Sequence, residues 1–69
     1  MYKDILTKRE RQIFELLIIN KTTKEIAELL NINEKTVRNH ISNTIQKLGV
    51  SSRTQAIITL LKNGLIKVD

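Results

Sequence analysis

The chain has 69 residues and a formal net charge of +5, with two Gly, no Pro and no Cys. This length allows one domain at most, and the absence of cysteine excludes a disulfide framework and a cysteine metal site. No apolar run is long enough for a signal peptide or a membrane-spanning helix. We therefore expect a soluble, helix-rich cytoplasmic protein with a core of Ile, Leu and Val.

The positive charge is unevenly distributed along the chain. Acidic and basic side chains balance over residues 1–34, whereas residues 35–68 contain no acid and these basic residues: Lys35, Arg38, Lys47, Arg53, Lys62 and Lys67. Concentrated positive charge is typical of a protein that binds a polyanion, because binding displaces counterions from phosphates. Lysine-rich surfaces also serve solubility, so charge alone does not decide the function.

The first predicted helix begins after Thr7. The segment Thr-Lys-Arg-Glu at 7–10 fits a capping box, in which Thr7 and Glu10 each accept from the other's backbone N–H. The next apolar residues have helical spacing and predict a helix over about 8–19: Ile13, Leu16 and Leu17. We interpret Glu10 as this cap rather than a partner contact, and the residues before Thr7 as a short, partly ordered arm.

A helix-turn-helix connection is predicted next. Thr-Thr-Lys-Glu at 22–25 fits a second capping box and begins a short helix over about 23–30. Asn31, Ile32 and Asn33 then form a three-residue turn, since Asn tolerates left-handed backbone geometry and Asn33 can cap the following helix. Ile32 is expected to fill the space between the two helices.

The longest predicted helix covers about residues 34–48 and carries two stripes. Its apolar stripe is Val37, Ile41, Ile45 and Leu48. The neighbouring face is polar and cationic without a carboxylate: Lys35, Arg38, Asn39, Ser42, Asn43 and Gln46. Arg, Asn and Ser carry donors and acceptors that match base edges in the major groove of DNA. The alternative is the solvent-facing side of an ordinary packing helix.

His40 is the single histidine of the chain. Catalysis or metal binding would need a second titrating group or further ligands, and the sequence supplies neither. His40 lies three residues after Val37, at the edge of the apolar stripe, so we expect it to pack against the second helix, with phosphate contact as the alternative. No cofactor, metal site or enzymatic activity is predicted.

The last predicted helix covers about residues 53–63, from a Ser52 cap to Gly64. Its expected core stripe is Ala56, Ile57, Leu60 and Leu61. Arg53 is expected to point inward along this helix and to pair with a carboxylate of the first helix, Glu10 or Glu15.

Ile58 and Leu65 fall off that core stripe. Exposed aliphatic side chains on so small a domain are most simply covered by a two-fold interface, because one short stripe then serves both subunits. We therefore assign Ile58, Leu61 and Leu65 to a homodimer interface. The alternative is ordinary surface, on which single exposed aliphatic residues are common.

Several spaced segments together resemble the LuxR/GerE-type DNA-binding domain. K-E-I-A, T-V-R-N-H-I and K-L-G-V stand at separations typical of the family, and the resemblance covers about residues 6–65. It implies an all-α, four-helix tetrahelical helix-turn-helix fold, a recognition helix in the major groove, and dimers that pair through the fourth helix on inverted half-sites. Many members have Gly near position 20 or 21, which this chain lacks. Because it begins with Met and carries no receiver or ligand-binding domain, it most resembles a stand-alone sporulation regulator.

The resemblance also implies which residues contact DNA. By position, Arg38, Asn39 and Ser42 match the places from which the family reaches base edges. These residues match or flank its phosphate contacts: Lys24, Lys35, Thr36, Asn43 and Lys47. Thr22 and Thr23 add hydroxyls and the N–H groups of a helix start, which suit phosphate oxygens. For Asn43 and Lys47, a solvated surface role is the alternative.

Two functional hypotheses follow. The first is a sequence-specific, double-stranded-DNA-binding transcription regulator that acts as a homodimer, with RNA polymerase as a further candidate partner and no membrane. The second is a small basic helical interaction module that binds an acidic protein or RNA. The first hypothesis is favoured by Arg38, Asn39 and Ser42, because an interaction module does not need these three side chains on one face of a helix.

Overall fold

The computed structural model describes residues 5–67, which form α1 (Lys8–Ile18), α2 (Thr23–Leu30), α3 (Glu34–Leu48) and α4 (Arg53–Lys62). All four helices begin at the predicted residues, whereas α1 and α4 end one residue earlier than predicted. The all-α helix-turn-helix fold is confirmed. Within residues 5–67, no helix combines the length and the apolar character needed to cross a membrane.

The predicted helix starts are formed by local side-chain hydrogen bonds. Thr7 and Glu10 close the capping box of α1, with the Thr7 N–H donating to Glu10 Oε1 over 2.9 Å. Thr22 and Glu25 close the second box at the start of α2. Asn33 caps α3 by accepting from the Thr36 N–H over 2.7 Å. These bonds satisfy helix N–H groups that have no acceptor within their own helix.

Asparagine takes the left-handed backbone position in both early turns. Asn31 ends α2 with φ 57°, and Asn20 has φ 70° in the turn between α1 and α2. Asn tolerates this conformation better than most residues because its short polar side chain bonds locally. Asn20 therefore supplies the turn geometry for which many LuxR-type domains use Gly.

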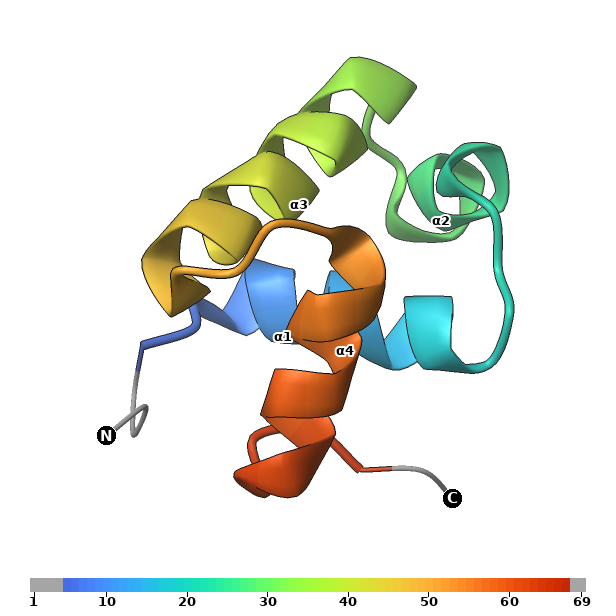
Figure 1. Ribbon diagram of the computed structural model, residues 1–69. Coiled ribbons are helices and arrows are strands. Elements are labelled where there is room, and N and C mark those ends of the chain that lie inside the picture. Colours follow the sequence, from blue (N-terminus) through green and yellow to red (C-terminus); the bar gives the residue numbers. More distant parts are fainter. Residues whose placement is uncertain (1–4, 68–69) are drawn as a thin grey trace.

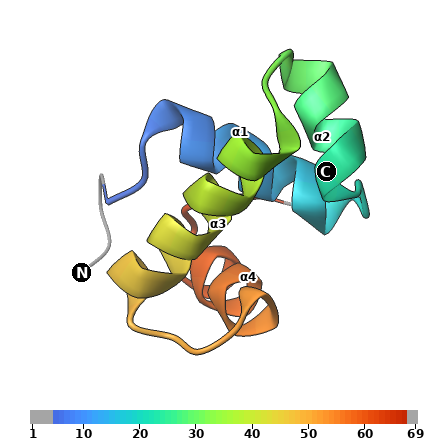
Figure 2. The same ribbon diagram turned by 90° about the horizontal axis from the view of Figure 1, so that it is seen from above.

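α3 is the central helix and packs against each of the other three. Figures 1 and 2 show α2 beside the N-terminal end of α3, with α1 and α4 packed along the rest of it. Its buried side chains are Val37, Ile41, Thr44 and Leu48. The sequence predicts Ile45 in this stripe, but Ile45 is only partly buried and Thr44 is 0% exposed. The Thr44 hydroxyl is satisfied at that site because it donates to the His40 carbonyl over 2.8 Å.

The buried surface of α4 is smaller than predicted. Ala56 and Leu60 are fully buried, whereas Ile57 is half-buried and Leu61 is exposed. The assignment of Leu61 to the core was therefore wrong. Leu6 before α1 and Ile66 after α4 supply the missing apolar cover, since both belong to the core. Residues 1–4 of the predicted N-terminal arm lie outside the described residues.

Candidate nucleic-acid interface

The polar stripe of α3 is exposed. Val37 is 0% exposed, and this burial fixes the rotation of the helix about its axis. The following side chains consequently face solvent: Lys35, Arg38, Asn39, Ser42, Asn43 and Gln46. Asn39, Ser42 and Asn43 make no side-chain hydrogen bond to another of the residues 5–67, so their donors and acceptors are available to a ligand.

Arg38 is held by a carboxylate at the N-terminal edge of this stripe. Its Nη1 donates to Glu34 Oε2 over 2.8 Å, with 56% of the Arg38 side chain exposed. The Thr23 hydroxyl donates to the same oxygen over 2.7 Å. The prediction that this face carries no carboxylate is therefore wrong at its N-terminal edge, where Glu34 lies beside Arg38. The pair was recognisable from the i, i+4 spacing of Glu34 and Arg38 on one helix.

The start of α2 lies beside the start of α3. The backbone N–H of Thr22 and its hydroxyl oxygen are both used in the capping box with Glu25. The hydroxyl hydrogen of Thr23 is directed to Glu34. Thr23 and Lys24 occupy the first two helical positions of α2, where backbone N–H groups have no acceptor within the helix and suit an anion. The Thr23 hydroxyl hydrogen is therefore engaged within the fold, whereas its backbone N–H lies at a helix start that suits an anion.

Thr36 and Lys47 already have partners in the structure. The Thr36 hydroxyl donates to Asn33 Oδ1 over 2.9 Å as part of the α3 cap. Lys47 Nζ donates to Glu10 Oε1 over 2.7 Å and to the Ile5 carbonyl over 3.3 Å. Lys47 therefore joins the end of α3 to the start of α1, and a phosphate contact would require it to leave Glu10.

Glu10 is the buried acidic residue of this arrangement, with 2% of its surface exposed. Burial alone would raise the pKa of its carboxyl group. Hydrogen bonds from Lys47 and from the Thr7 backbone, together with the Lys47 charge, outweigh burial and hold the pKa below its usual 4.5. Glu10 is consequently ionised at neutral pH and forms an ion pair inside the fold. Its predicted role as a helix cap is confirmed, and Lys47 adds a second role.

Two predicted contacts are wrong. Arg53 was expected to pair with Glu10 or Glu15, but it is exposed, and the ion pairs among residues 5–67 do not include it. Lys47 occupies the position at Glu10 instead, because it lies on the face of α3 that packs on α1. His40 was expected beside α2, but it lines a shallow hollow with Thr7 and Glu10 at the start of α1.

α4 presents aliphatic side chains to solvent. Ile58 is 55% exposed and Leu61 is 36% exposed, three residues apart on one helix. Leu65 is partly buried after the helix end, and its carbonyl accepts from Arg11 Nη1. The exposure of Ile58 and Leu61 agrees with a surface role, whereas Leu65 also packs on the core.

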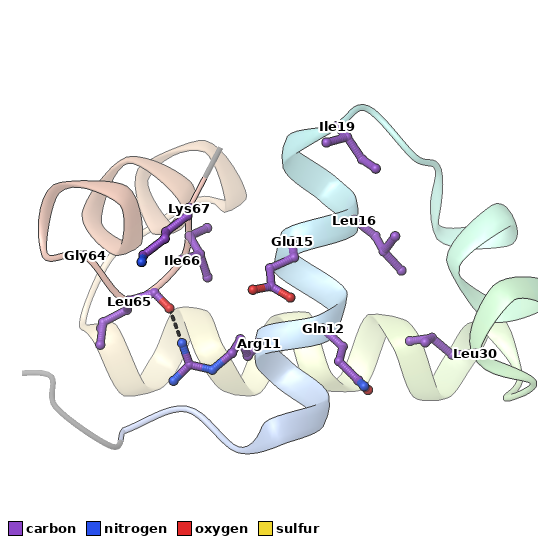
Figure 3. Close-up of a pocket in the computed structure, with 10 residues that line it drawn as sticks. All are labelled: Arg11, Gln12, Glu15, Leu16, Ile19, Leu30, Gly64, Leu65, Ile66 and Lys67. Carbon is purple, nitrogen blue, oxygen red and sulfur yellow. Dashed lines mark hydrogen bonds between the residues drawn. The ribbon is translucent and has the colours of Figure 1, made fainter. Parts of the chain in front are cut away.

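A groove of about 560 Å³ lies on the side of α1 away from α3. Figure 3 shows Leu16, Ile19 and Leu30 at one end, Arg11 and the segment from Gly64 to Lys67 at the other, and α3 passing behind α1. Glu15 projects between the two ends. Within residues 5–67, no group of three His, Cys, Asp or Glu side chains could hold a metal ion. The groove therefore combines apolar and charged side chains, and it lies apart from the polar stripe of α3.

Comparison with known proteins gives a consistent set of relatives. Residues 4–60 match the family of bacterial regulatory proteins, luxR family. The chain is 62% identical to the spore germination protein GerE of Bacillus subtilis over 66 residues, which span 96% of the chain and 89% of that protein. It is 47% identical to the transcriptional regulatory protein DegU of Brevibacillus brevis, over 93% of the chain but 27% of DegU. A solved structure of the transcription factor GerE superposes with a TM-score of 0.93 at 61% identity, over 96% of this chain and 98% of that one.

Proposed function

The chain belongs to the luxR family of bacterial regulatory proteins, and we propose that it binds duplex DNA as a homodimer on inverted half-sites, with α3 in the major groove. Its likeness to GerE covers nearly the whole of both chains, so it is a DNA-binding transcription regulator and not an enzyme. We propose a role in sporulation, the bacterial cytoplasm as its site of action, and RNA polymerase as a partner at promoters.

The observation that carries this proposal is the orientation of α3. Full burial of Val37 turns Arg38, Asn39 and Ser42 toward solvent together. Arg pairs with the O6 and N7 acceptors of guanine, Asn with adenine, and Ser with several base edges, so these three side chains can read sequence. They lie in the N-terminal half of α3, the part of a recognition helix that contacts bases.

Phosphate contacts fix the position of such a helix on the duplex. The exposed ammonium groups of Lys24 and Lys35, together with the backbone N–H groups at the start of α2, suit this task. Thr22, Thr36, Asn43 and Lys47 remain proposed phosphate contacts, although Thr36 and Lys47 must exchange an internal partner for DNA. These contacts contribute affinity without sequence preference.

A dimer through α4 would bring two recognition helices to successive turns of the duplex. Ile58 and Leu61 supply an exposed apolar surface for it, and Leu65, the third proposed interface residue, is partly buried. A two-fold axis pairs this surface with its own copy, which agrees with inverted half-sites. The contact is small, so we expect it to form mainly when both copies are on DNA.

The test is selection of bound duplexes from a random pool, followed by titration at two salt concentrations. We expect an enriched inverted repeat that binds roughly 10³-fold more tightly than random duplex at physiological salt. RNA of the same sequence and polyglutamate serve as competitors. Equal affinity for every duplex, or tighter binding of RNA or polyglutamate, would support an interaction module in place of a sequence-specific regulator.

A further inference from the structure

Glu34 joins the starts of both helices of the helix-turn-helix. A single carboxylate oxygen, Oε2, accepts from the Thr23 hydroxyl over 2.7 Å and from Arg38 Nη1 over 2.8 Å. Thr23 is the first residue of α2, and Arg38 lies one turn into α3 beyond Glu34. Glu34 therefore contacts a side chain from each helix at the edge of the proposed DNA-binding surface.

This carboxylate stays charged under ordinary conditions. The hydrogen bond from Thr23 lowers the pKa of Glu34 most; loss of hydration opposes it, and the nearby charges of Arg38 and Lys24 lower the pKa further. A negative charge at this place repels phosphates and offsets the charge of Arg38. Affinity for random DNA depends on the number of phosphates that cations neutralise, so Glu34 reduces that affinity.

The pairing leaves Arg38 able to read a base. An arginine carries five N–H donors, and Glu34 engages Nη1 alone. The remaining donors of the guanidinium keep its planar fork available to the O6 and N7 acceptors of guanine. A guanidinium held at one nitrogen also loses less conformational freedom when it binds than one that moves freely.

We propose that Glu34 is a positioning residue: it restrains Arg38 from neutralising phosphates and directs it to a base edge. Glu34 thereby increases the ratio between the affinity for the preferred site and the affinity for random DNA. This inference rests on the proposed function above. The simpler explanation is that Glu34 is an acid at a helix start with an exposed i, i+4 partner, which contributes a little helix stability and nothing more.

The experiment compares Glu34→Ala with Glu28→Ala, which removes the same charge from an exposed glutamate of α2 that makes no ion pair with residues 5–67. The probes are the duplex selected by the wild-type protein and a random duplex, each titrated over a range of salt. For Glu34→Ala, we expect the ratio of the two affinities to fall about fivefold, part of the discrimination that one arginine–guanine contact supplies. The salt slope for random duplex should steepen by about 0.9, as Arg38 becomes free to meet a phosphate.

Two further variants separate positioning from stability. Glu34→Gln keeps an acceptor oxygen for Thr23 and Arg38 without the charge, so it should retain more of the affinity ratio than Glu34→Ala. In an Arg38→Ala background, Glu34→Ala should leave the ratio unchanged, because the residue through which it acts is absent. Circular dichroism checks folding. If Glu34→Ala does not fold, Glu34→Gln is compared with Glu28→Gln instead, and an equal change of the affinity ratio in these two variants overturns the inference.

The inference is overturned if Glu34→Ala and Glu28→Ala change the affinity ratio equally, or if Glu34→Ala changes it as much without Arg38 as with it. Either result would leave the proposed function intact, provided that the wild-type protein prefers its selected duplex. A wild-type protein without any preference would overturn the proposed function itself. The two failures are therefore distinguishable within one set of titrations.

Discussion

α3 and α4 both turn one face to solvent, and the two faces differ in chemistry. α3 exposes Arg38, Asn39 and Ser42, whereas α4 exposes Ile58 and Leu61. Polar donors and acceptors suit bases and phosphates, and aliphatic side chains suit another protein surface. We infer that recognition of DNA and pairing of two copies are assigned to separate helices, so each can be altered without the other.

The two helices also differ in how firmly the core fixes them. α3 packs against all three other helices and buries four side chains along its length, whereas α4 fully buries Ala56 and Leu60. A helix with a long buried stripe has a fixed rotation, so its exposed stripe is fixed as well. The core therefore determines which residues are exposed more strictly on α3, the helix proposed to read bases, than on α4.

The largest effect is expected from a charge on the buried side of α3. Val37→Asp places an unpaired carboxylate at a site with 0% exposure, at a cost of about 4 kcal/mol or more. A single core in a domain of this size supplies only about 3–5 kcal/mol of stability, so we expect most of the helical signal in circular dichroism to be lost. Asn39→Asp, on the exposed side, is the control and should fold. A helical Val37→Asp variant would mean that α3 is rotated from its described position.

The next largest loss of stability is expected when Glu10 is replaced, because Glu10 stabilises the contact between α1 and α3. Glu10→Ala removes the acceptor of Lys47 and of the Thr7 N–H, and we expect a loss of roughly 1–3 kcal/mol in urea unfolding. Glu28→Ala, at an exposed position, should change stability by less than about 0.5 kcal/mol. Equal losses for the two variants would mean that the Glu10–Lys47 pair does not stabilise the fold.

The same ion pair predicts a pH dependence of stability. The pKa of Glu10 is lowered in the folded protein from its usual 4.5, so Glu10 contributes its full stabilisation above pH 4.5. This stabilisation is lost as the pH falls below 4.5 and through the lower pKa that Glu10 has in the folded protein. Glu10→Ala should therefore show a weaker decline of stability below pH 4.5 than the wild-type protein. A decline of the same size in both would assign the acid sensitivity to other carboxylates.

Ile58→Glu tests the separate role of α4. The exposed position predicts a folded monomer with unchanged binding to a single half-site, together with loss of cooperative binding to the inverted repeat. The expected weakening on the full repeat is about tenfold, equivalent to about 1.4 kcal/mol. Thr54→Glu, at an exposed polar position of the same helix, is the matched control for charge. Full affinity of Ile58→Glu for the repeat would place the dimer surface elsewhere.

The smallest effect is expected at Lys35, on the exposed stripe of α3. Lys35→Ala should weaken binding to preferred and random duplexes by the same factor and reduce the salt slope by about one unit. Fluorescence anisotropy over a range of salt measures both quantities. An unchanged slope would remove Lys35 from the proposed phosphate contacts.

Much of the fold could be predicted from short-range patterns in the sequence. The spacing of Thr7 and Glu10, and of Thr22 and Glu25, predicted two helix starts that the structure confirms. Periodicity predicted correctly that Val37 is buried and Arg38 exposed. These features depend on residues within one or two helical turns of each other, which a single sequence displays directly.

Features that depend on distant contacts were not predicted. Thr44 is buried by the helices that pack on α3, and its polarity concealed this core position, although its hydroxyl is satisfied locally by the carbonyl one turn earlier. The Lys47–Glu10 pair joins residues 37 positions apart. No local spacing predicts a contact over that separation, so the prediction of Arg53 as the partner of Glu10 was wrong. Burial of Leu6 and Ile66 likewise depends on where the two ends of the chain meet the core.

The central claim is that the exposed stripe of α3 reads base edges, and Arg38→Ala tests it most directly. The affinities of wild-type and Arg38→Ala proteins are measured for the selected duplex and for random duplex at one salt concentration. We expect the selected duplex to lose about 1–3 kcal/mol more binding free energy than the random duplex, because a bidentate contact to guanine is lost. A loss of the same factor on both duplexes would make Arg38 a phosphate contact and contradict the account.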